Sequence, residues 1–302
     1  MAEKIKLTFL GTGSAVPTKK KNHSATLIQY KDESILIDCG EGTQRQFRYA
    51  DISPAKLTKI LITHWHGDHV LGLPGLLQTL MLNNFSKNLE IYGPEGTQRM
   101  LETMMSLFVG KGDQLKIRVY EIEPGIIIDN DEFFIQAEQM DHDAPTLAYS
   151  FNIKEKSRLD KQKLKKLKIP NSPLLGELAK GKTIEINGKK IDPKKLIYKE
   201  EAKKITIIPD TRLNNNCYKI AENSDILISE STYDKEGEEL AKEYFHLTSE
   251  QAAEIAKKSK SKKLFLVHLS QKHEKDASNL LKEAKKIFKN TILAEDLMNL
   301  EL

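Results

Sequence analysis

The chain has 302 residues, of which 39% are hydrophobic and 30% charged, so it can bury a sizeable core and is globular in composition rather than disordered. No apolar run approaches the ~20 residues that a membrane span needs, and the N-terminus has no secretory signal pattern, so we expect a cytoplasmic protein with no membrane partner. Two cysteines are too few for a disulfide framework or a thiolate metal site, and the net charge of +4 is mild.

The first half of the chain reads as a series of short strands. Residues 31–33 are polar and lie between two of them, which indicates a hairpin. Apolar residues recur at three- and four-residue steps over 70–82 and 97–108, which predicts helices there. The strands are predicted at 6–10, 25–29, 34–37, 59–63, 89–92, 117–122, 133–138 and 146–153.

Residues 153–203 differ in composition from the rest. They include a Lys- and Leu-rich run over 159–167 that predicts a helix, and Asn187-Gly188, which is typical of the type I′ turn of a hairpin. From Lys154 to Lys204 there are 17 Lys and Arg against 7 Asp and Glu, so the remainder of the chain is net acidic. Because it has few apolar residues for its length, we expect this segment to project from the body.

This charge asymmetry has two interpretations. A basic segment on an acidic body favours an anionic partner, nucleic acid first. The alternative is a lysine-rich face that does no more than contact solvent.

The last hundred residues alternate between strands at 205–208, 226–229 and 264–267 and helices at 249–258 and 276–288. Thr248-Ser249-Glu250-Gln251 has the capping-box pattern that opens a helix. Strand–helix alternation, with antiparallel hairpins near the start, predicts a layered α/β sandwich.

The strongest chemical motif is Thr63-His64-Trp65-His66-Gly67-Asp68-His69, directly after an apolar strand. In extended backbone alternate side chains point the same way, so His64, His66 and Asp68 can converge. His69 follows where the chain turns into the next helix. Imidazole and carboxylate groups at this density suit zinc, manganese or iron.

Three further strands deliver a residue of a ligand type at their C-terminal ends, where open α/β sheets commonly place their sites. His142 follows 133–138, Asp210 follows 205–208, and His268 follows 264–267. Taken singly, each could be a cap or turn residue. The repetition of the pattern at strand ends predicts one shared site.

These residues carry a resemblance to a known superfamily. His64-x-His66-x-Asp68-His69, with the later His142, Asp210 and His268, is similar to the metallo-β-lactamase superfamily. Within it the chain resembles the ribonuclease Z family, which removes 3′ trailers from precursor tRNA. The further matching features are Asp38-Cys39-Gly40-Glu41-Gly42-Thr43-Gln44, His246-Leu247-Thr248 and the inserted basic segment.

The resemblance covers nearly the whole chain, and it implies both a fold and an organisation. The fold is α/β, a metallo-β-lactamase αββα sandwich with an inserted basic arm. Residues 1–152 and 204–302 would form the catalytic domain, and residues 153–203 an exosite arm. The implied activity is zinc-dependent endonucleolytic cleavage that leaves a 3′-hydroxyl on the tRNA and a 5′-phosphate on the trailer.

The resemblance also implies roles for individual residues, with two zinc ions per chain, or manganese or iron in their place. Asp68 would bind metal and accept a proton from the attacking water, and His246 would donate a proton to the leaving oxygen or contact phosphate. The first zinc would be held by His64, His66, His142 and Asp210, and the second by Asp68, His69, Asp210 and His268.

Two segments are implied to contact the tRNA, within a homodimer in which the arm of one subunit serves the site of the other. Lys19, Lys20 and Lys21 lie in a loop that resembles the family's Pro-x-Lys-x-Arg-Asn, and Ser172-Pro173 stands where the arm usually has Gly-Pro. Lysine in place of arginine keeps the attraction to phosphate but loses bidentate geometry. The sequence leaves open whether precursors that already carry CCA are cut.

Two other functions remain as alternatives. One is a general or cyclic-nucleotide phosphodiesterase of the same fold, for which a short arm without positive charge would be typical. The other is an RNA-binding protein that uses metal only for stability, against which the intact ligand set argues.

Overall fold

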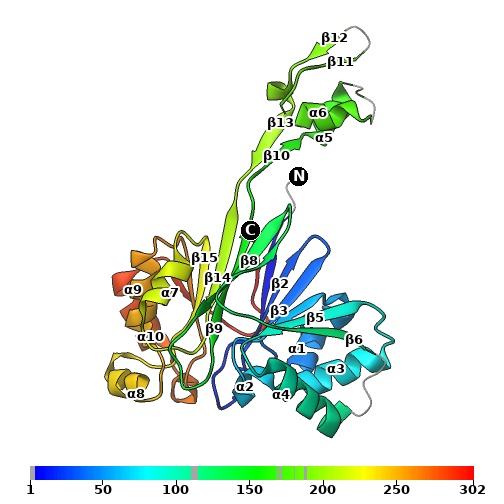
Figure 1. The fold of residues 1–302 in the computed structure, drawn as a ribbon. Coiled ribbons are helices and arrows are strands. Elements are labelled where there is room, and N and C mark those ends of the chain that lie inside the picture. Colours follow the sequence, from blue (N-terminus) through cyan, green and yellow to red (C-terminus); the bar gives the residue numbers. More distant parts are fainter. Residues whose placement is uncertain (1–3, 110–114, 168, 170–171, 180, 187–188) are drawn as a thin grey trace.

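The computed structural model describes residues 4–109, 115–167, 169, 172–179, 181–186 and 189–302. Two seven-stranded sheets lie face to face, helices cover their outer faces, and a slender arm extends from one end of the body (Figure 1). This is the expected αββα layering. Every helix in the described ranges is too short or too polar to cross a bilayer.

The first sheet contains the N-terminal strands and the last strand of the chain. Strands β1 to β3 are antiparallel, with β2 and β3 forming the predicted hairpin, and β3 to β6 are parallel. Helices α1 (Thr43–Tyr49), α3 (Leu73–Leu82) and α4 (Thr97–Met104) cover its outer face (Figure 1). The strand order is β18 (Asn299–Glu301), β1 (Lys6–Gly11), β2 (Ala25–Tyr30), β3 (Glu33–Ile37), β4 (Lys59–Leu61), β5 (Asn88–Gly93) and β6 (Lys116–Glu121).

The second sheet contains the strands from the middle and end of the chain. Strands β14 to β17 are parallel, whereas β14, β9, β8 and β7 are antiparallel. Helices α7 (Asn215–Ala221), α9 (Ser249–Lys258) and α10 (Ser278–Ile287) cover its outer face (Figure 1). The strand order is β17 (Thr291–Leu293), β16 (Leu264–Val267), β15 (Ile226–Glu230), β14 (Lys203–Ile208), β9 (Leu147–Ile153), β8 (Phe133–Gln139) and β7 (Gly125–Asp129).

Alternation along each strand divides the core into layers. On β3, Ile35 and Ile37 pack between the two sheets, whereas Leu36 packs under the helices of the first sheet. Both faces of a covered sheet must be apolar, so these strands read as nearly continuous hydrophobic runs. A third cluster fills the space between the second sheet and α7, α9 and α10.

The predicted helix over 70–82 is wrong as one unit, because it forms as α2 (Gly67–Val70) and α3 with a break at Gly72. A Cβ on Gly72 would lie 2.0 Å from the carbonyl oxygen of Gly40, so the chain passes directly against the loop after β3. This contact between segments far apart in sequence has no local signature.

Other elements differ in extent or were missed. The helix predicted over 159–167 is only α5 (Lys161–Lys166), because the Asp160 carboxylate caps its N-terminus and Leu159 belongs to a strand. The helix over 97–108 is α4 followed by a π-helical turn, Met105–Val109. Neither α1 nor β7 was predicted. Short 3₁₀ turns lie at Pro54–Lys56, Pro193–Lys195, Lys235–Gly237 and Gln271–His273.

The arm leaves the body after β9 and returns at the start of β14. Strands β10 (Lys156–Leu159) and β13 (Ile197–Glu200) pair as its stalk. Its outer part holds α5, α6 (Leu174–Ala179) and the hairpin β11 (Ile184–Ile186)–β12 (Lys189–Ile191) (Figure 1). The predicted turn at Asn187-Gly188 lies outside the described residues. The arm has a small apolar core of its own, made by Leu164, Leu178, Ile184 and Leu196.

Candidate metal centre

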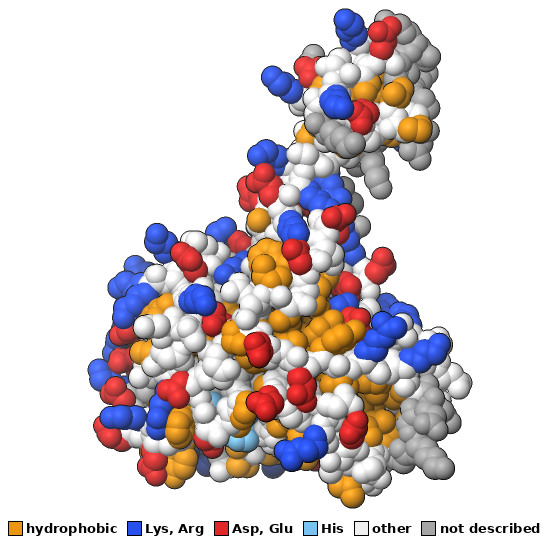
Figure 2. All heavy atoms as spheres, viewed as in Figure 1, with side chains coloured by type: hydrophobic (Ala, Val, Ile, Leu, Met, Phe, Trp, Pro, Cys, Tyr) orange, Lys and Arg blue, Asp and Glu red, His pale blue; other side chains and the backbone are white. Residues whose placement is uncertain are grey.

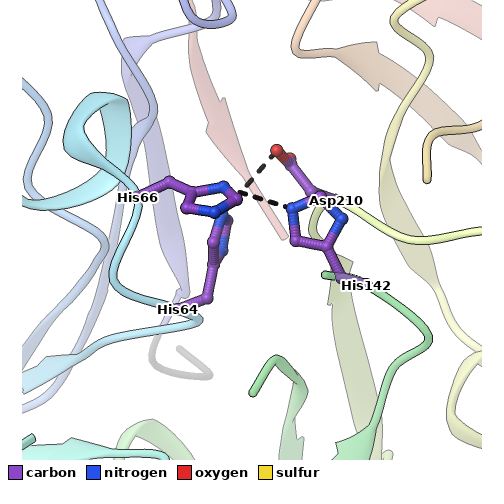
Figure 3. Close-up of side chains that lie close together, drawn as sticks. All are labelled: His64, His66, His142 and Asp210. Carbon is purple, nitrogen blue, oxygen red and sulfur yellow. Dashed lines mark hydrogen bonds and ion pairs between the residues drawn. The ribbon is translucent and has the colours of Figure 1, made fainter. Parts of the chain in front are cut away.

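Strand ends from both sheets bring the residues of the first predicted ligand set to one edge of the sandwich. His64 and His66 follow β4, His142 follows β8, and Asp210 follows β14. One nitrogen or oxygen of each of the four lies within 4.8 Å of the others. Figure 3 shows the three imidazoles and the carboxylate pointing toward one another from the segments that follow β4, β8 and β14.

The second predicted set lies directly beside the first and shares Asp210 with it. Asp68 and His69 lie on α2, and His268 follows β16. Nε2 of His268 lies 3.1 Å from Oδ2 of Asp68 and 3.3 Å from Oδ1 of Asp210. The structure therefore brings all seven residues that the sequence singled out as ligands into one continuous cluster.

The donor atoms of this cluster fit metal ions. Nε2 of His64 and Oδ1 of Asp210 are buried, and neither makes a hydrogen bond to the residues that the structure describes. Buried polar atoms are rarely left without a partner, and a bound ion is one of the few explanations for those that are. Imidazole nitrogens and carboxylate oxygens in two adjacent sets of four match the preferred shell of zinc and similar metals.

Electrostatics favour the ligating forms of His64 and Asp210. Burial, together with the neighbouring His69, holds the pKa of His64 well below its usual range, so its imidazole is neutral. Burial would raise the pKa of Asp210, but His268 and His69 outweigh it and hold that pKa well below its usual value. A neutral imidazole beside an ionised carboxylate is the state in which both bind a cation.

Asp38, which follows β3, orients part of the cluster. Its Oδ2 lies 2.7 Å from Nδ1 of His69, and its two oxygens accept hydrogen bonds from the backbone and hydroxyl of Thr63. Such a partner fixes the tautomer of an imidazole so that Nε2 faces the metal. Sequence reasoning gave Asp38 no role in the site, although its position at a strand end is the same signal that identified Asp210.

His246 lies beside the cluster, after helix α8 (Glu238–Glu243). Its Nδ1 is 3.1 Å from Oε1 of Glu230 and 3.9 Å from Oδ2 of Asp210. Burial lowers the pKa of His246, but the charge and hydrogen bond of Glu230 outweigh it and raise the pKa to about 9. The buried carboxylate of Glu230 therefore favours the protonated form of His246. Glu230 is fully buried at the end of β15, and sequence reasoning missed it.

The residues predicted to contact the substrate differ in exposure and in their place in the fold. Lys19 and Lys20 are exposed on the loop between β1 and β2. Lys21 turns inward, and its ammonium donates to the hydroxyl of Thr12 and the carbonyl of Ala294. Ser172-Pro173 precedes α6 in the outer part of the arm, far along the chain from every ligand residue.

Comparisons with known proteins show the family and the fold of this chain. A ribonuclease Z of Archaeoglobus fulgidus is 39% identical to this chain over 99% of it and 98% of its own length. The short form of human tRNase Z is similar in structure, with a TM-score of 0.71, 28% identity and 98% of each chain covered. The metallo-β-lactamase fold protein YhfI of Bacillus subtilis has a TM-score of 0.72, 19% identity and complete coverage of both chains. Residues 5–155 match the family described as anti-Pycsar protein Apyc1. The expected fold is confirmed.

Proposed function

This chain belongs to the ribonuclease Z family and, through residues 5–155, to the family described as anti-Pycsar protein Apyc1, and on that premise we propose that it removes the 3′ trailer from precursor tRNA. It is a metal-dependent endoribonuclease. Cleavage leaves a 3′-hydroxyl on the tRNA and a 5′-phosphate on the trailer. The observation that carries this proposal is the pair of ligand sets joined through Asp210, with His246 directly beside them.

The proposed cofactors are two zinc ions per chain, and the same donors would also accept manganese or iron. His64, His66, His142 and Asp210 would hold one ion, and Asp68, His69, Asp210 and His268 the other. When bound, the pair supplies Lewis-acid stabilisation of charge on the scissile phosphate and makes water more acidic.

Two side chains are proposed to move the protons. Asp68 belongs to the second ligand set and its side chain is 10% exposed; its carboxylate accepts a proton from the water that attacks phosphorus. As the bond from phosphorus to the 3′-oxygen of the tRNA breaks, that oxygen takes a proton from His246. The raised pKa of His246, about 9, supports this second role, because the donor must hold its proton before the step.

The arm is proposed to bind tRNA away from the chemistry. The span from Lys154 to Lys204 carries an excess of ten positive charges, and Figure 2 shows Lys and Arg side chains along the arm. Such an excess suits a polyanionic substrate. Several of these cations are paired at the arm root, where Glu132 binds Lys156 and Arg158. Lys19 and Lys20 lie on the loop between β1 and β2 and are proposed to contact phosphates near the cleavage point. That loop reaches the cluster through Thr12, whose carbonyl accepts a hydrogen bond from the backbone N–H of His268.

In a homodimer, the arm of one subunit would reach the metal cluster of the other subunit. The arm enters β14 at its first residue, whereas Asp210 follows its last, so about 20 Å of strand separates the arm root from the chain's own cluster. The arm also points away from that edge of the body (Figure 1). It is therefore better placed to serve the cluster of a second copy.

An apolar surface supports the same assembly. Four large hydrophobic side chains on α3, α4 and the π-helical turn after α4 are exposed: Leu82, Met100, Leu107 and Phe108. The π-helical turn lies beside both α3 and α4, and exposed apolar side chains that gather in one region mark interaction sites. A second copy of the chain is the proposed occupant, and sedimentation of Phe108→Asp beside the unaltered protein tests it: the variant should be monomeric.

The direct test of function uses an internally labelled precursor tRNA with a 3′ trailer. The metal-loaded protein should release one trailer fragment with a 5′-phosphate, and a chelator should stop the reaction. Asp68→Asn keeps the shape of the side chain but removes the charge and the proton acceptor, so cleavage should fall on the order of 10³-fold. Turnover of small phosphodiesters without any cut in precursor tRNA would favour a general phosphodiesterase instead.

A further inference from the structure

Phe245 has a backbone conformation that large side chains rarely adopt. Its φ is +59°, in the left-handed region that favours glycine. It follows the last turn of α8 and Tyr244, and the next residue, His246, donates its backbone N–H to the carbonyl of Ala241 at 2.7 Å. This bond is the longer of the two that define a Schellman helix end, in which the residue at the position of Phe245 is usually glycine. A phenylalanine there needs a reason, because such strain persists where function uses it.

Arg212 holds the Phe245 ring in place. The central carbon of its guanidinium lies 3.5 Å from the centre of the ring, a close cation–π contact. Its Nε donates to the carbonyl of Lys242 at 2.8 Å, within the same helix end. Its backbone N–H donates to the carbonyl of Asp141 at 2.8 Å. Arg212 therefore fastens the end of α8 to the loop that carries His142.

The backbone of Phe245 reaches the metal cluster directly. Its carbonyl oxygen accepts a hydrogen bond of 3.2 Å from Nδ1 of His142. With Nδ1 engaged, Nε2 of His142 is directed into the cluster, 3.2 Å from Nδ1 of His66. The Phe245 ring lies edge-on to the His142 ring, with centres 6.2 Å apart. Phe245 thus contacts the proposed ligand His142 and directly precedes the proposed proton donor His246 in the sequence.

We propose that Phe245 and Arg212 form a positioning pair for the metal centre. The stacked guanidinium holds Phe245 in its left-handed conformation, so that its carbonyl sets the ring of His142 and its peptide sets the place of His246. Both residues act through others, because neither belongs to a ligand set. The proposal rests on the assignments of His142 and His246 made above.

The test combines two variants and one matched control. Phe245→Gly keeps the carbonyl and permits the left-handed backbone, but removes the ring that Arg212 holds. Arg212→Lys keeps the charge but loses the planar stack and the Nε donor. Tyr244→Ala removes an exposed aromatic ring one residue away and serves as the control.

Each variant is measured in three ways: thermal unfolding of the metal-free protein, zinc affinity by competition with a chelator, and kcat and KM on precursor tRNA. We expect Phe245→Gly to unfold at the same temperature as the unaltered protein or higher, because the backbone strain is relieved. Zinc affinity should fall about 10-fold or more in both variants, as it does when the hydrogen-bond partner of a ligand is disturbed. The kcat should fall about 10-fold with KM within a factor of two, since the arm and its charge are untouched.

Unchanged zinc affinity and kcat in Phe245→Gly would overturn the proposal and make the ring an ordinary surface contact. The proposal would also be overturned if the metal-free protein of both variants unfolded at a lower temperature and the loss of zinc affinity followed that loss of stability. The two residues would then only pack the fold. The zinc measurement needs no substrate. If precursor tRNA proves not to be the substrate, the proposed function fails while the positioning of His142 is still judged.

Discussion

Oδ2 of Asp38 lies 2.7 Å from Nδ1 of His69, and both residues are buried. The contact joins the end of β3 to helix α2. Through it, a carboxylate outside the proposed ligand sets orients one of the proposed ligands. Burial lowers the pKa of His69, but Asp210 and Asp38 outweigh it and hold that pKa well above its usual range. In a metal-loaded centre the same hydrogen bond leaves Nε2 free to ligate.

Asp38→Asn should therefore weaken metal binding. The amide keeps the shape of the side chain but loses the negative charge that faces Nδ1 of His69, so we expect zinc affinity to fall about 10- to 100-fold. Asp51→Asn is the matched control, because Asp51 also has a positive φ, +55° against +58°, but is exposed. Competition with a chelator measures both. Equal affinities in the two variants would show that Asp38 does not support the centre.

The convergence of the seven proposed ligands could be predicted from the sequence, because these residues obey a local rule. His64, His66 and Asp68 follow a buried strand at alternating positions, and Asp210 and His268 follow other strands whose carboxyl ends meet at the same edge. Strand polarity alone therefore predicts convergence. The hairpin of β2 and β3 was likewise predictable from alternation across a short polar loop.

The supporting residues could not be predicted, because their roles arise from contacts between distant segments. In the sequence, nothing distinguishes Glu230 from other carboxylates at strand ends. Its role depends on the fold, which brings His246, sixteen residues later, into contact with it. Phe245 has no sequence feature that signals its left-handed backbone. The break between α2 and α3 at Gly72 depends on the approach of Gly40. Local propensity contains none of these tertiary constraints.

Loss of the His246 imidazole should slow the chemical step without reducing the amount of bound metal. His246→Gln keeps a polar side chain but cannot donate the proton, so kcat on precursor tRNA should fall about 10²-fold or more. Glu230→Gln should have a smaller effect in the same direction, because the charge that raises the pKa of His246 is removed. Metal content should stay at the unaltered value in both. A drop in metal content equal to the drop in rate would make His246 a ligand instead.

The stability of the protein should depend on pH through Glu132, at the place where the arm joins the body. Its carboxylate binds Lys156, Lys31 and Arg158 at 2.5 to 2.7 Å. Partial burial raises the pKa of Glu132, but those hydrogen bonds outweigh it and lower the pKa from 4.5 to about 2. The stabilisation is therefore complete above pH 4.5 and is lost as the pH falls toward 2.

Thermal unfolding of Glu132→Gln beside the unaltered protein checks this. The variant should melt lower at neutral pH, and the difference should shrink below pH 4.5. Glu155→Gln is the control, because the Glu155–Lys199 pair is exposed on the same stalk and should contribute little. A difference between Glu132→Gln and the unaltered protein that persists unchanged in acid would mean that shape, not charge, matters at this position.

Removal of the arm should separate binding from chemistry. Replacing residues 157–202 with a short Gly/Ser linker leaves β9, β14 and every ligand residue in place. Hydrolysis of a small chromogenic phosphodiester should persist, while precursor tRNA cleavage collapses through weaker binding. In the intact protein the affinity for tRNA should fall steeply with salt, because phosphate contacts release counterions. Undiminished tRNA cleavage would make the basic segment a solvated face, and loss of both activities from a folded, metal-loaded variant would make the arm part of the catalytic site.

A zinc titration of metal-free protein, with bound zinc per chain and precursor tRNA cleavage followed in the same samples, decides whether cleavage needs both metal ions. Because Asp210 links the two ligand sets, we predict that cleavage stays low at one zinc per chain and rises to its full rate as the second site fills. The product at full occupancy should be tRNA with a 3′-hydroxyl and a trailer with a 5′-phosphate. Full activity at one zinc per chain, or cleavage that persists in metal-free protein, would contradict the account.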